Sequence, residues 1–312
     1  MPRSGSTLLQ RLLMGHKEIA STSEPWILLP LLYANKSTGV VSEYSHHNSQ
    51  KAINDLIAQL PEQEATYYQS LAASTNSLYS ALCKNNEAYF LDKTPRYYLI
   101  IPEIKKLYPD AKFIFLFRNP VDIYASILTT WGNNSFRRLY ASHIDLNEGL
   151  KYLSEGWHLL HEQAFQVNYE DLVKEPESCL RSLCTYLNLP FDRHLLANLG
   201  QQKMTGRLGD PTGVKEYQEV EEKSLDKWKV VFNTRFRQKV LTDYIADIDS
   251  SVLLTQGYSK HNILAEINKL DVCYQGMAKD LLHIGFYQLA KFLNAHLFFT
   301  QTFKWARNKY LS

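Results

Sequence analysis

The sequence predicts an α/β fold in which a mostly parallel sheet is covered by helices, with a helical extension at the C-terminal end. Short apolar runs alternate with helical patterns up to about residue 220, and helical patterns alone follow. Apolar residues make up 45% of the chain and charged residues 21%, which is typical of a globular domain with a buried core.

The elements before residue 110 alternate between helix and strand. The first helix follows a Ser- and Gly-rich segment at residues 3–6, and its apolar residues recur at helical spacing. The elements predicted in this part are a helix at Thr7–Met14, a strand at Glu18–Ser23, a helix at Tyr67–Leu82, a strand at Ala88–Leu91 and a helix at Tyr97–Leu107.

The segment Ala111–Phe117 (AKFIFLF) is the clearest buried strand, because its apolar run is nearly continuous. Pro120 follows two residues after the strand ends and suits the first turn of the next helix. Another strand is predicted at Ala164–Tyr169, and the segment Gly206–Gly213 (GRLGDPTG) predicts a loop. We expect one domain over residues 1–270 and an aromatic-rich helical extension over 271–312.

Composition excludes several classes of function. The formal net charge is only +2, so no concentrated basic face for nucleic acid is expected. The four cysteines are scattered, which indicates reduced thiols and no disulfide framework or zinc site. No apolar run of about twenty residues predicts a transmembrane helix, and no signal peptide is visible, so we expect a cytoplasmic protein.

The first candidate site is the N-terminal segment Pro2-Arg3-Ser4-Gly5-Ser6-Thr7-Leu8-Leu9. A small-residue loop that opens a helix directs several backbone N–H groups at one point, where the helix dipole favours an anion. Arg3 adds a full positive charge, and the hydroxyls of Ser6 and Thr7 add donors. A Ser-rich helix cap without a ligand is the alternative. The loop lacks the Lys of the nucleoside triphosphatase motif GxxxxGK[ST].

The second candidate is Arg118, directly after the best strand, with Ser126 about two turns into the next helix. An Arg at a strand end and a Ser on the following helix can bind one phosphate, because the guanidinium offers a planar fork of donors. Alternatively, Arg118 forms an ion pair with Asp122 and Ser126 makes a small core contact.

Three further polar or aromatic residues lie at or just beyond the ends of predicted strands: Glu24, Lys93 and Tyr169. Two of them have a plain structural interpretation, Lys93 as a solvated loop residue and Tyr169 as a core aromatic. However, the carboxyl ends of parallel strands share one sheet edge, where ligands bind. Together with Arg118 they therefore predict a binding crevice at that edge.

These motifs resemble the PAPS-dependent sulfotransferases (PAPS is 3′-phosphoadenosine 5′-phosphosulfate), in particular a bacterial branch similar to tyrosylprotein sulfotransferases. The N-terminal loop resembles their 5′-phosphosulfate loop, and Arg118 to Ser126 (RNPVDIYAS) resembles their 3′-phosphate motif. The segment that begins at Tyr169 (YEDL) resembles the family segment near the adenine. The similarity runs from residue 2 to about residue 230 and implies a P-loop-like parallel sheet.

The resemblance implies a role for each matched residue. Arg3 and the backbone of Ser4 to Leu8 would hold the 5′-phosphosulfate, Arg118 and Ser126 the 3′-phosphate, and Tyr169 would lie against the adenine.

The resemblance also implies the catalytic groups. Glu24 matches the general base of the tyrosylprotein branch, while other branches use a His; His16 lies uncomfortably close to the end of the first helix for that role. Lys93, with Arg3, would stabilise the leaving phosphate. No metal is implied, and a solvated helix face explains His158, His161 and Glu162 better than a metal site does.

A loop of this kind normally follows a buried strand, and no such strand stands before Met1, so we expect that an upstream segment is missing. The alternatives are therefore a nucleotide-binding pseudoenzyme with an incomplete sheet, or an ATP-dependent kinase that lacks the usual loop Lys.

The acceptor is expected to be a hydroxyl on a carbohydrate or a lipid-linked carbohydrate, with contacts from Trp26–Tyr33 and Trp131–Tyr140. The aromatic C-terminal extension predicts either a helical pair packed on protein, which we favour, or peripheral contact with a membrane surface.

Overall fold

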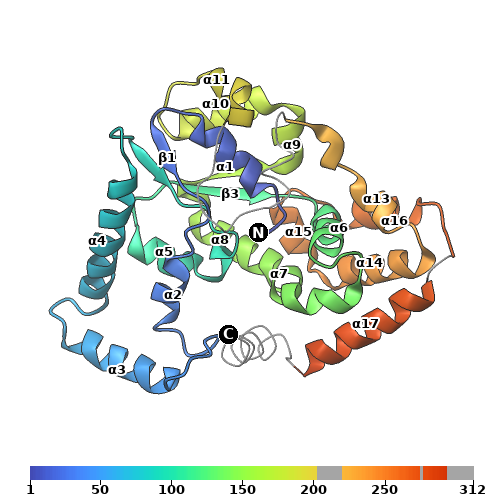
Figure 1. Cartoon of the computed structure of the whole chain (residues 1–312), viewed down its shortest axis with the longest axis horizontal. Coiled ribbons are helices and arrows are strands. Elements are labelled where there is room, and N and C mark those ends of the chain that lie inside the picture. Colours follow the sequence, from blue (N-terminus) through green and yellow to red (C-terminus); the bar gives the residue numbers. More distant parts are fainter. Residues whose placement is uncertain (202–219, 275–276, 294–312) are drawn as a thin grey trace, which may run out of the picture.

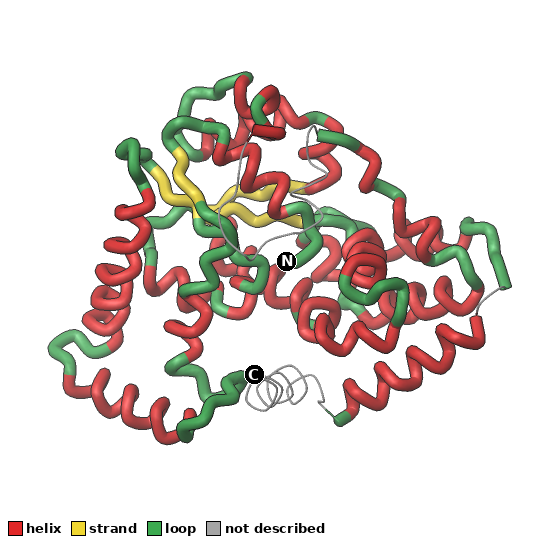
Figure 2. The backbone as a smooth tube through the Cα atoms, in the orientation of Figure 1, coloured by secondary structure: helices red, strands yellow, loops and turns green. Residues whose placement is uncertain are grey.

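The computed structural model describes residues 1–201, 220–274 and 277–293 and consists mainly of helices around short parallel strands (Figure 1). Strand β1 (Ile19–Ser21) pairs in parallel with β2 (Tyr89–Leu91), so that Ile19 lies opposite Tyr89. Strand β3 (Phe113–Phe117) pairs in parallel with β4 (Ala164–Asn168), so that Phe117 lies opposite Asn168. The strands form two separate two-stranded sheets in this part of the chain, coloured yellow in Figure 2.

Helices connect and cover these strands (Figure 1). Those in the first part of the chain are α1 (Ser6–Met14), α2 (Leu28–Tyr33), α3 (His46–Gln59), α4 (Glu64–Leu82) and α5 (Ile101–Leu107). The next are α6 (Pro120–Thr130), α7 (His143–Asn147), α8 (Gly149–Leu160), α9 (Tyr169–Lys174), α10 (Pro176–Tyr186) and α11 (His194–Ala197). The last are α13 (Lys227–Val231), α14 (Arg235–Asp247), α15 (Ser250–Thr255), α16 (Lys260–Asn268) and α17 (Met277–Phe292). Short 3₁₀ helices are η1 (Tyr97–Leu99), η2 (Phe136–Ser142), η3 (His161–Gln163), η4 (Leu199–Gln201) and η5 (Glu222–Ser224).

The predicted parallel α/β fold is confirmed, but the described strands form two pairs where one sheet was expected, and two elements differ in detail. The helix expected over Tyr97–Leu107 is divided into η1 and α5, because Pro102 lies in the first turn of α5 and supplies no N–H to continue the preceding turn. Tyr169 was expected to end a strand, but it is the first residue of α9. The predicted loop at Gly206–Gly213 lies outside the described residues.

Strand β3 is buried on both faces, which explains its continuous apolar sequence. Phe115 and Phe117 point into one core cluster, together with the fully buried Trp228 of α13. Leu116 points into a second cluster, where Leu8 and Leu12 of α1 pack. The alternation fixes the carboxyl end of β3 beside the start of α1, where the candidate site lies.

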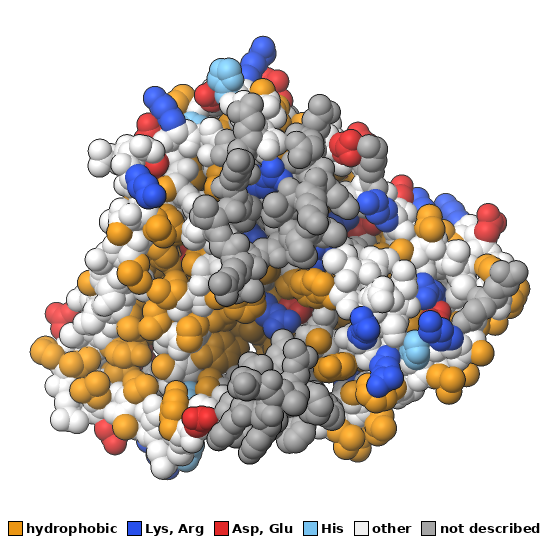
Figure 3. All heavy atoms as spheres, in the orientation of Figure 1, with side chains coloured by type: hydrophobic (Ala, Val, Ile, Leu, Met, Phe, Trp, Pro, Cys, Tyr) orange, Lys and Arg blue, Asp and Glu red, His pale blue; other side chains and the backbone are white. Residues whose placement is uncertain are grey.

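Helix α17, the described part of the predicted extension, packs on the main core through the buried Tyr287. Asp280 forms an ion pair with Arg237 of α14 at 2.6 Å. On the outer face of α17, Leu282 is 76% exposed and Phe292 is 82% exposed. Figure 3 shows hydrophobic side chains gathered over α17. None of the helices in the described residues is both long and apolar enough to span a membrane. The aromatic residues beyond residue 293 lie outside the described part.

Candidate active site

The N-terminal loop forms a tight turn into α1. Arg3 and Gly5 both have left-handed backbone conformations, with φ of 63° and 92°. Gly5 is the cap residue of α1 and offers no side chain to the helix, while its carbonyl accepts the N–H groups of Leu8 and Leu9. The N–H groups of Ser6 and Thr7 precede these bonds and have no acceptor within the helix, which is the arrangement that binds anions.

Tyr169 explains why the loop requires glycine at position 5. A Cβ atom at Gly5 would lie 2.2 Å from ring carbons of Tyr169, closer than any side chain tolerates. Tyr169 is fully buried, and its hydroxyl lies 2.6 Å from the Ser224 hydroxyl. The tyrosine therefore supports the loop directly.

Arg118 joins the N-terminal loop to the segment that follows β3. Its guanidinium lies over the Tyr169 ring, 4.3 Å from the centroid, and donates to the backbone carbonyls of Arg3 and Ser224, each at 3.0 Å. Arg3 in turn donates from Nε to the Ser126 hydroxyl on α6, also at 3.0 Å. Within the described residues the buried Nε of Arg118 has no hydrogen-bond partner, which leaves one donor for a ligand.

Asp122 lies beside this cluster in the first turn of α6. Burial raises the pKa of its carboxyl to about 7, while the nearby Arg118 opposes the shift and Glu170 adds to it. The charge of Arg118 is therefore only partly balanced by Asp122 at neutral pH.

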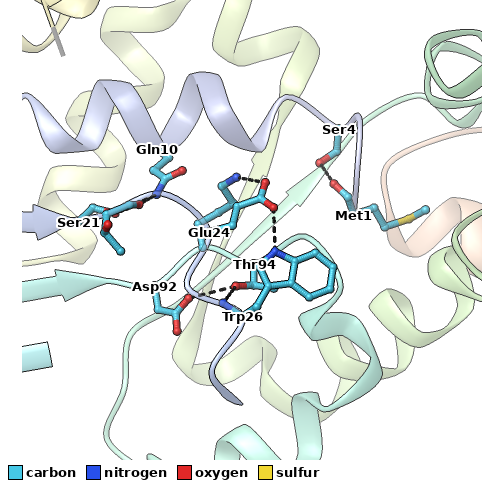
Figure 4. Close-up of polar contacts among 10 residues, drawn as sticks. Met1, Ser4, Gln10, Ser21, Glu24, Trp26, Asp92 and Thr94 are labelled. Carbon is cyan, nitrogen blue, oxygen red and sulfur yellow. Dashed lines mark hydrogen bonds and ion pairs between the residues drawn. The ribbon is translucent and has the colours of Figure 1, made fainter. Parts of the chain in front are cut away.

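Glu24 and Lys93 form a buried ion pair after β1 and β2. The Lys93 ammonium donates to Glu24 Oε1 at 2.7 Å, and the two side chains are only 12% and 10% exposed. The Trp26 indole donates to Glu24 Oε2 at 3.1 Å (Figure 4). A carboxylate has about four lone-pair sites, so these two donors leave acceptor capacity for a substrate proton.

Asp92 holds this region in place. The hydroxyls of Tyr79 and Tyr97 donate to its carboxylate at 2.6 and 2.7 Å, and Thr94 donates to it at 3.4 Å. Thr94 accepts the backbone N–H of Trp26 at 3.2 Å (Figure 4), and Trp26 has a left-handed φ of 56°. This chain of contacts fixes the turn that carries Glu24, and burial raises the pKa of Asp92.

The loop, Glu24 and the two tryptophans line a common pocket. Its volume is about 240 Å³, and its walls include Arg3 and Gly5 of the loop, Glu24, Trp26 and Trp131. Trp131, at the end of α6, is 41% exposed. A reacting group bound here would touch both the N-terminal loop and the Glu24 carboxylate.

Arg96 is a further pocket residue that sequence reasoning missed. Its guanidinium donates to both oxygens of the fully buried Asp145, at 3.1 and 2.7 Å, and the Tyr98 hydroxyl donates to the same carboxylate at 2.6 Å. Arg96 lies three residues after Lys93 in the same loop after β2, and that proximity in sequence could have marked it as a candidate site residue. Ser224 was missed as well, because no strand or motif precedes it.

His16 makes structural contacts. His16 is buried at the end of α1, where its ring nitrogens contact the carbonyl of Pro190 at 2.9 Å and the N–H of Glu18 at 3.1 Å. These contacts disfavour it as a base. Across residues 1–201, 220–274 and 277–293, no group of three His, Cys, Asp or Glu side chains could hold a metal ion.

The family model of the sulfotransferase family matches residues 1–193. The chain belongs to this family. It is 33% identical over 142 residues to the nodulation protein NoeE of Sinorhizobium fredii, covering 42% of this chain and 30% of NoeE. It is 23% identical over 229 residues to protein-tyrosine sulfotransferase 1 of Danio rerio, covering 67% of this chain and 56% of that protein.

Two solved structures are similar to this sulfotransferase-family chain. The sulfotransferase domain of the curacin biosynthetic pathway shows 25% identity and a TM-score of 0.44, with 74% of this chain and 88% of that domain covered. The sulfotransferase domain of the Synechococcus PCC 7002 olefin synthase shows 22% identity and a TM-score of 0.46, with coverages of 87% and 93%. The chain spans about a third of the length of the first curated relatives, 30% of NoeE and 32% of an Aquifex aeolicus protein.

Proposed function

We propose that this chain transfers a sulfonate group from PAPS to an acceptor hydroxyl, with Glu24 as the general base. The observation that carries the proposal is the convergence of two phosphate motifs that lie far apart in sequence: Arg3 contacts Ser126, and Arg118 contacts the backbone of Arg3. A nucleotide with phosphates at both the 5′ and 3′ positions needs two such motifs together.

The residues present suit such a nucleotide. The start of α1 has no side-chain cap, so its N–H groups suit a 5′-phosphosulfate together with Arg3. The unpartnered, buried Nε of Arg118 and the hydroxyl of Ser126 suit a 3′-phosphate. In the proposal Tyr169 supports the nucleotide site from behind the loop, because its fully buried ring lies between Arg118 and Gly5.

The reaction proceeds in line. PAPS supplies the sulfonate on a phosphate oxygen; the sulfur forms a bond to the acceptor oxygen as its bond to the 5′-phosphate oxygen breaks. Glu24 takes the acceptor proton, and Lys93, 2.7 Å from Glu24, stabilises the charge that develops on the leaving phosphate with Arg3. Positioning and charge stabilisation supply the rate, as in phosphoryl transfer.

The acceptor is proposed to be a carbohydrate or a carbohydrate-bearing lipid. Two indoles, Trp26 and Trp131, line the pocket beside Glu24 and offer flat apolar surfaces with a polar edge, which suit a sugar ring. A protein tyrosine, the acceptor class named for the Danio rerio relative, is the comparison substrate.

The first experiment compares thermal stabilisation by 3′-phosphoadenosine 5′-phosphate with that by ADP. Ligand at about a hundred times its dissociation constant stabilises the fold by about 2.7 kcal/mol. We expect a shift with the 3′-phosphorylated nucleotide and little with ADP. Equal shifts favour an ATP-dependent kinase, and absence of both contradicts the proposal. With PAPS present, transfer to oligosaccharide, glycolipid and tyrosyl peptide acceptors then ranks the acceptor classes.

A further inference from the structure

Helix α17 has an apolar face that points away from the protein. Its inner face packs on the core through Tyr287 and Ala290, and the carboxylate of Asp280 is buried against Arg237. Six large apolar side chains are exposed on the outer face, within about 140° of the helix circumference: Leu281, Leu282, Phe286, Leu289, Phe292 and Leu293. A helix with one packed face ordinarily turns polar residues to solvent, so these six residues, called here the α17 face, are suited to an apolar partner.

Exposed cations border the α17 face, and the described helices α17 and η2 carry no exposed carboxylate beside them. Lys279 and Lys291 are exposed on α17, and Arg137 and Arg138 are exposed on η2, which packs on α17. The Arg137 guanidinium lies 4.9 Å from the centroid of the Phe286 ring, at the margin of the apolar face. Figure 3 shows blue Lys and Arg side chains beside the apolar surface over α17. The surface therefore combines an apolar stripe with positive margins.

A second copy of the chain matches this surface poorly. In a dimer with two-fold symmetry the same patch meets itself, so the cations of one copy face those of the other. Neither helix has an exposed carboxylate to compensate, and juxtaposed like charges disfavour such a contact. The remaining residues of the chain bring the same sign of charge, because residues 294–312 include Lys304, Arg307 and Lys309 and neither Asp nor Glu.

An anionic membrane surface matches both features of the patch. A helix that lies in the plane of a bilayer inserts its apolar side chains about 5–10 Å into the boundary between headgroups and acyl chains. Leu and Phe are typical of the inserted face, and Lys and Arg at the margins are attracted to anionic lipids. The α17 face supplies the first group, and the four exposed cations supply the second.

We propose that α17 docks this protein on an anionic membrane surface, with the α17 face inserted at the headgroup boundary and the cations of α17 and η2 against lipid phosphates. The helix lies along the surface and keeps its inner face on the protein core, so docking requires no rearrangement of the packing around Tyr287.

The docking surface is connected to the candidate pocket through η2. Ser135, directly before η2, contacts His283 of α17 at 3.0 Å. Trp131 lines the pocket and lies five residues before Phe136, the first residue of η2, so the two are separated by at most about 18 Å. Docking therefore brings a pocket wall near the bilayer, where a carbohydrate-bearing lipid is within reach. This consequence rests on the proposed sulfotransfer, whereas the docking itself does not.

Flotation of the full chain with lipid vesicles tests the proposal. Vesicles of phosphatidylcholine with about a third phosphatidylglycerol are compared with vesicles of phosphatidylcholine alone. We expect the anionic vesicles to bind the chain about tenfold or more tightly, because several cations lie against the lipid phosphates. Raising the salt from about 0.1 M to about 1 M should weaken this binding, since the Debye length falls from about 10 Å to about 3 Å.

The variant Leu282→Gln with Leu289→Gln removes two side chains at the centre of the α17 face and leaves the charge unchanged. We expect it to bind the anionic vesicles about tenfold or more weakly than the wild type, because less apolar surface enters the bilayer. Leu78→Gln with Leu254→Gln is the matched control, because these leucines are exposed on α4 and α15. All four positions are exposed, so thermal midpoints close to that of the wild type are expected for both variants.

A second variant tests the charged margins. Lys279→Gln with Arg138→Gln should weaken binding to the anionic vesicles and leave binding to phosphatidylcholine unchanged.

Several outcomes overturn the proposal. One is the absence of wild-type binding to the anionic vesicles, and another is an equal loss in the leucine variant and its control. Equal, salt-independent binding to both kinds of vesicle also overturns it, because the cations then play no part. So does a wild-type dimer in light scattering that the leucine variant converts to a monomer, since a second copy then covers the face. Vesicle binding needs neither PAPS nor an acceptor, so its failure leaves the sulfotransfer proposal untouched.

Discussion

Glu24 is held by two donors, which makes its carboxylate the best-oriented base in the pocket. Lys93 and the Trp26 indole fix its two oxygens at 2.7 and 3.1 Å. An amide in the same place keeps the shape of the side chain but cannot take a proton.

Replacing Glu24 by Gln is therefore expected to lower kcat by about 10²–10⁴-fold while leaving nucleotide-induced thermal stabilisation unchanged. Transfer is measured with PAPS and the best acceptor. Glu18→Gln is the matched control, because Glu18 is 35% exposed and its carboxylate contacts only Lys17 among the ion pairs of the described residues. Full turnover by Glu24→Gln would remove Glu24 from the mechanism.

A substitution at Arg118 tests the proposed 3′-phosphate site. Its planar fork bridges two carbonyls and leaves Nε for a ligand, whereas lysine keeps the charge but not the fork. We expect Arg118→Lys to weaken binding of 3′-phosphoadenosine 5′-phosphate by about 10- to 100-fold, the worth of one charge-assisted bond. Adenosine 5′-phosphosulfate, which lacks the 3′-phosphate, should lose little.

Calorimetric titration of both nucleotides checks this expectation. Arg181→Lys serves as the control, because Arg181 contacts Glu177 at 2.6 Å and the Phe191 ring, neither of which lines the candidate pocket. Equal losses for both nucleotides would show that Arg118 acts mainly by supporting the loop.

At the scale of elements, the turn into α1 depends on the absence of a side chain at Gly5. The Cβ of an alanine at position 5 would lie 2.2 Å from the Tyr169 ring. The alanine backbone would also have to adopt a φ of 92°, where it is strained. The turn and α9 are therefore packed as one unit.

We expect Gly5→Ala to lower the thermal midpoint by about 5 °C or more and to abolish stabilisation by 3′-phosphoadenosine 5′-phosphate. Gly285→Ala in α17 is the comparison, because nothing lies within 4 Å of an added Cβ there. That change should be neutral or stabilise by up to about 1 kcal/mol, since alanine favours a helix. Similar behaviour of the two variants would mean that Tyr169 readily moves away from the loop.

At the scale of the whole molecule, Asp122 links global stability to pH. Its pKa is about 7 in the fold, against the ordinary value of 3.8, so the folded protein binds the extra proton between these values. The free energy of unfolding should therefore fall as pH rises from about 4 to about 7, by up to about 1.4 kcal/mol per pH unit, and level off above.

Urea unfolding of the wild type and of Asp122→Asn at about pH 5 and about pH 8 checks this sign. The variant should lose less stability than the wild type over that interval, because its amide does not titrate. Asp92, whose pKa is also raised by burial, leaves a slope in both proteins. Parallel curves would show that Asp122 ionises normally in the fold.

Local patterns in the sequence were sufficient for the elements that carry the site. The apolar run of β3, the proline that begins α6 and the small residues before α1 each act within a few neighbouring positions, so the sequence alone predicts them. The order of strand ends likewise predicted one binding edge, since parallel strands share it. The roles of Glu24, Lys93 and the phosphate motifs rested on resemblance to the family.

Tertiary structure decided how those parts meet. The contact of Arg3 with Ser126 joins residues 123 apart, and the Lys93–Glu24 pair joins residues 69 apart. Such contacts depend on how helices pack against the sheet, and no local pattern encodes that distance. The burial of Tyr169 against Gly5 and the separation of the sheet into two pairs are likewise properties of packing, because they arise only when distant segments share one core.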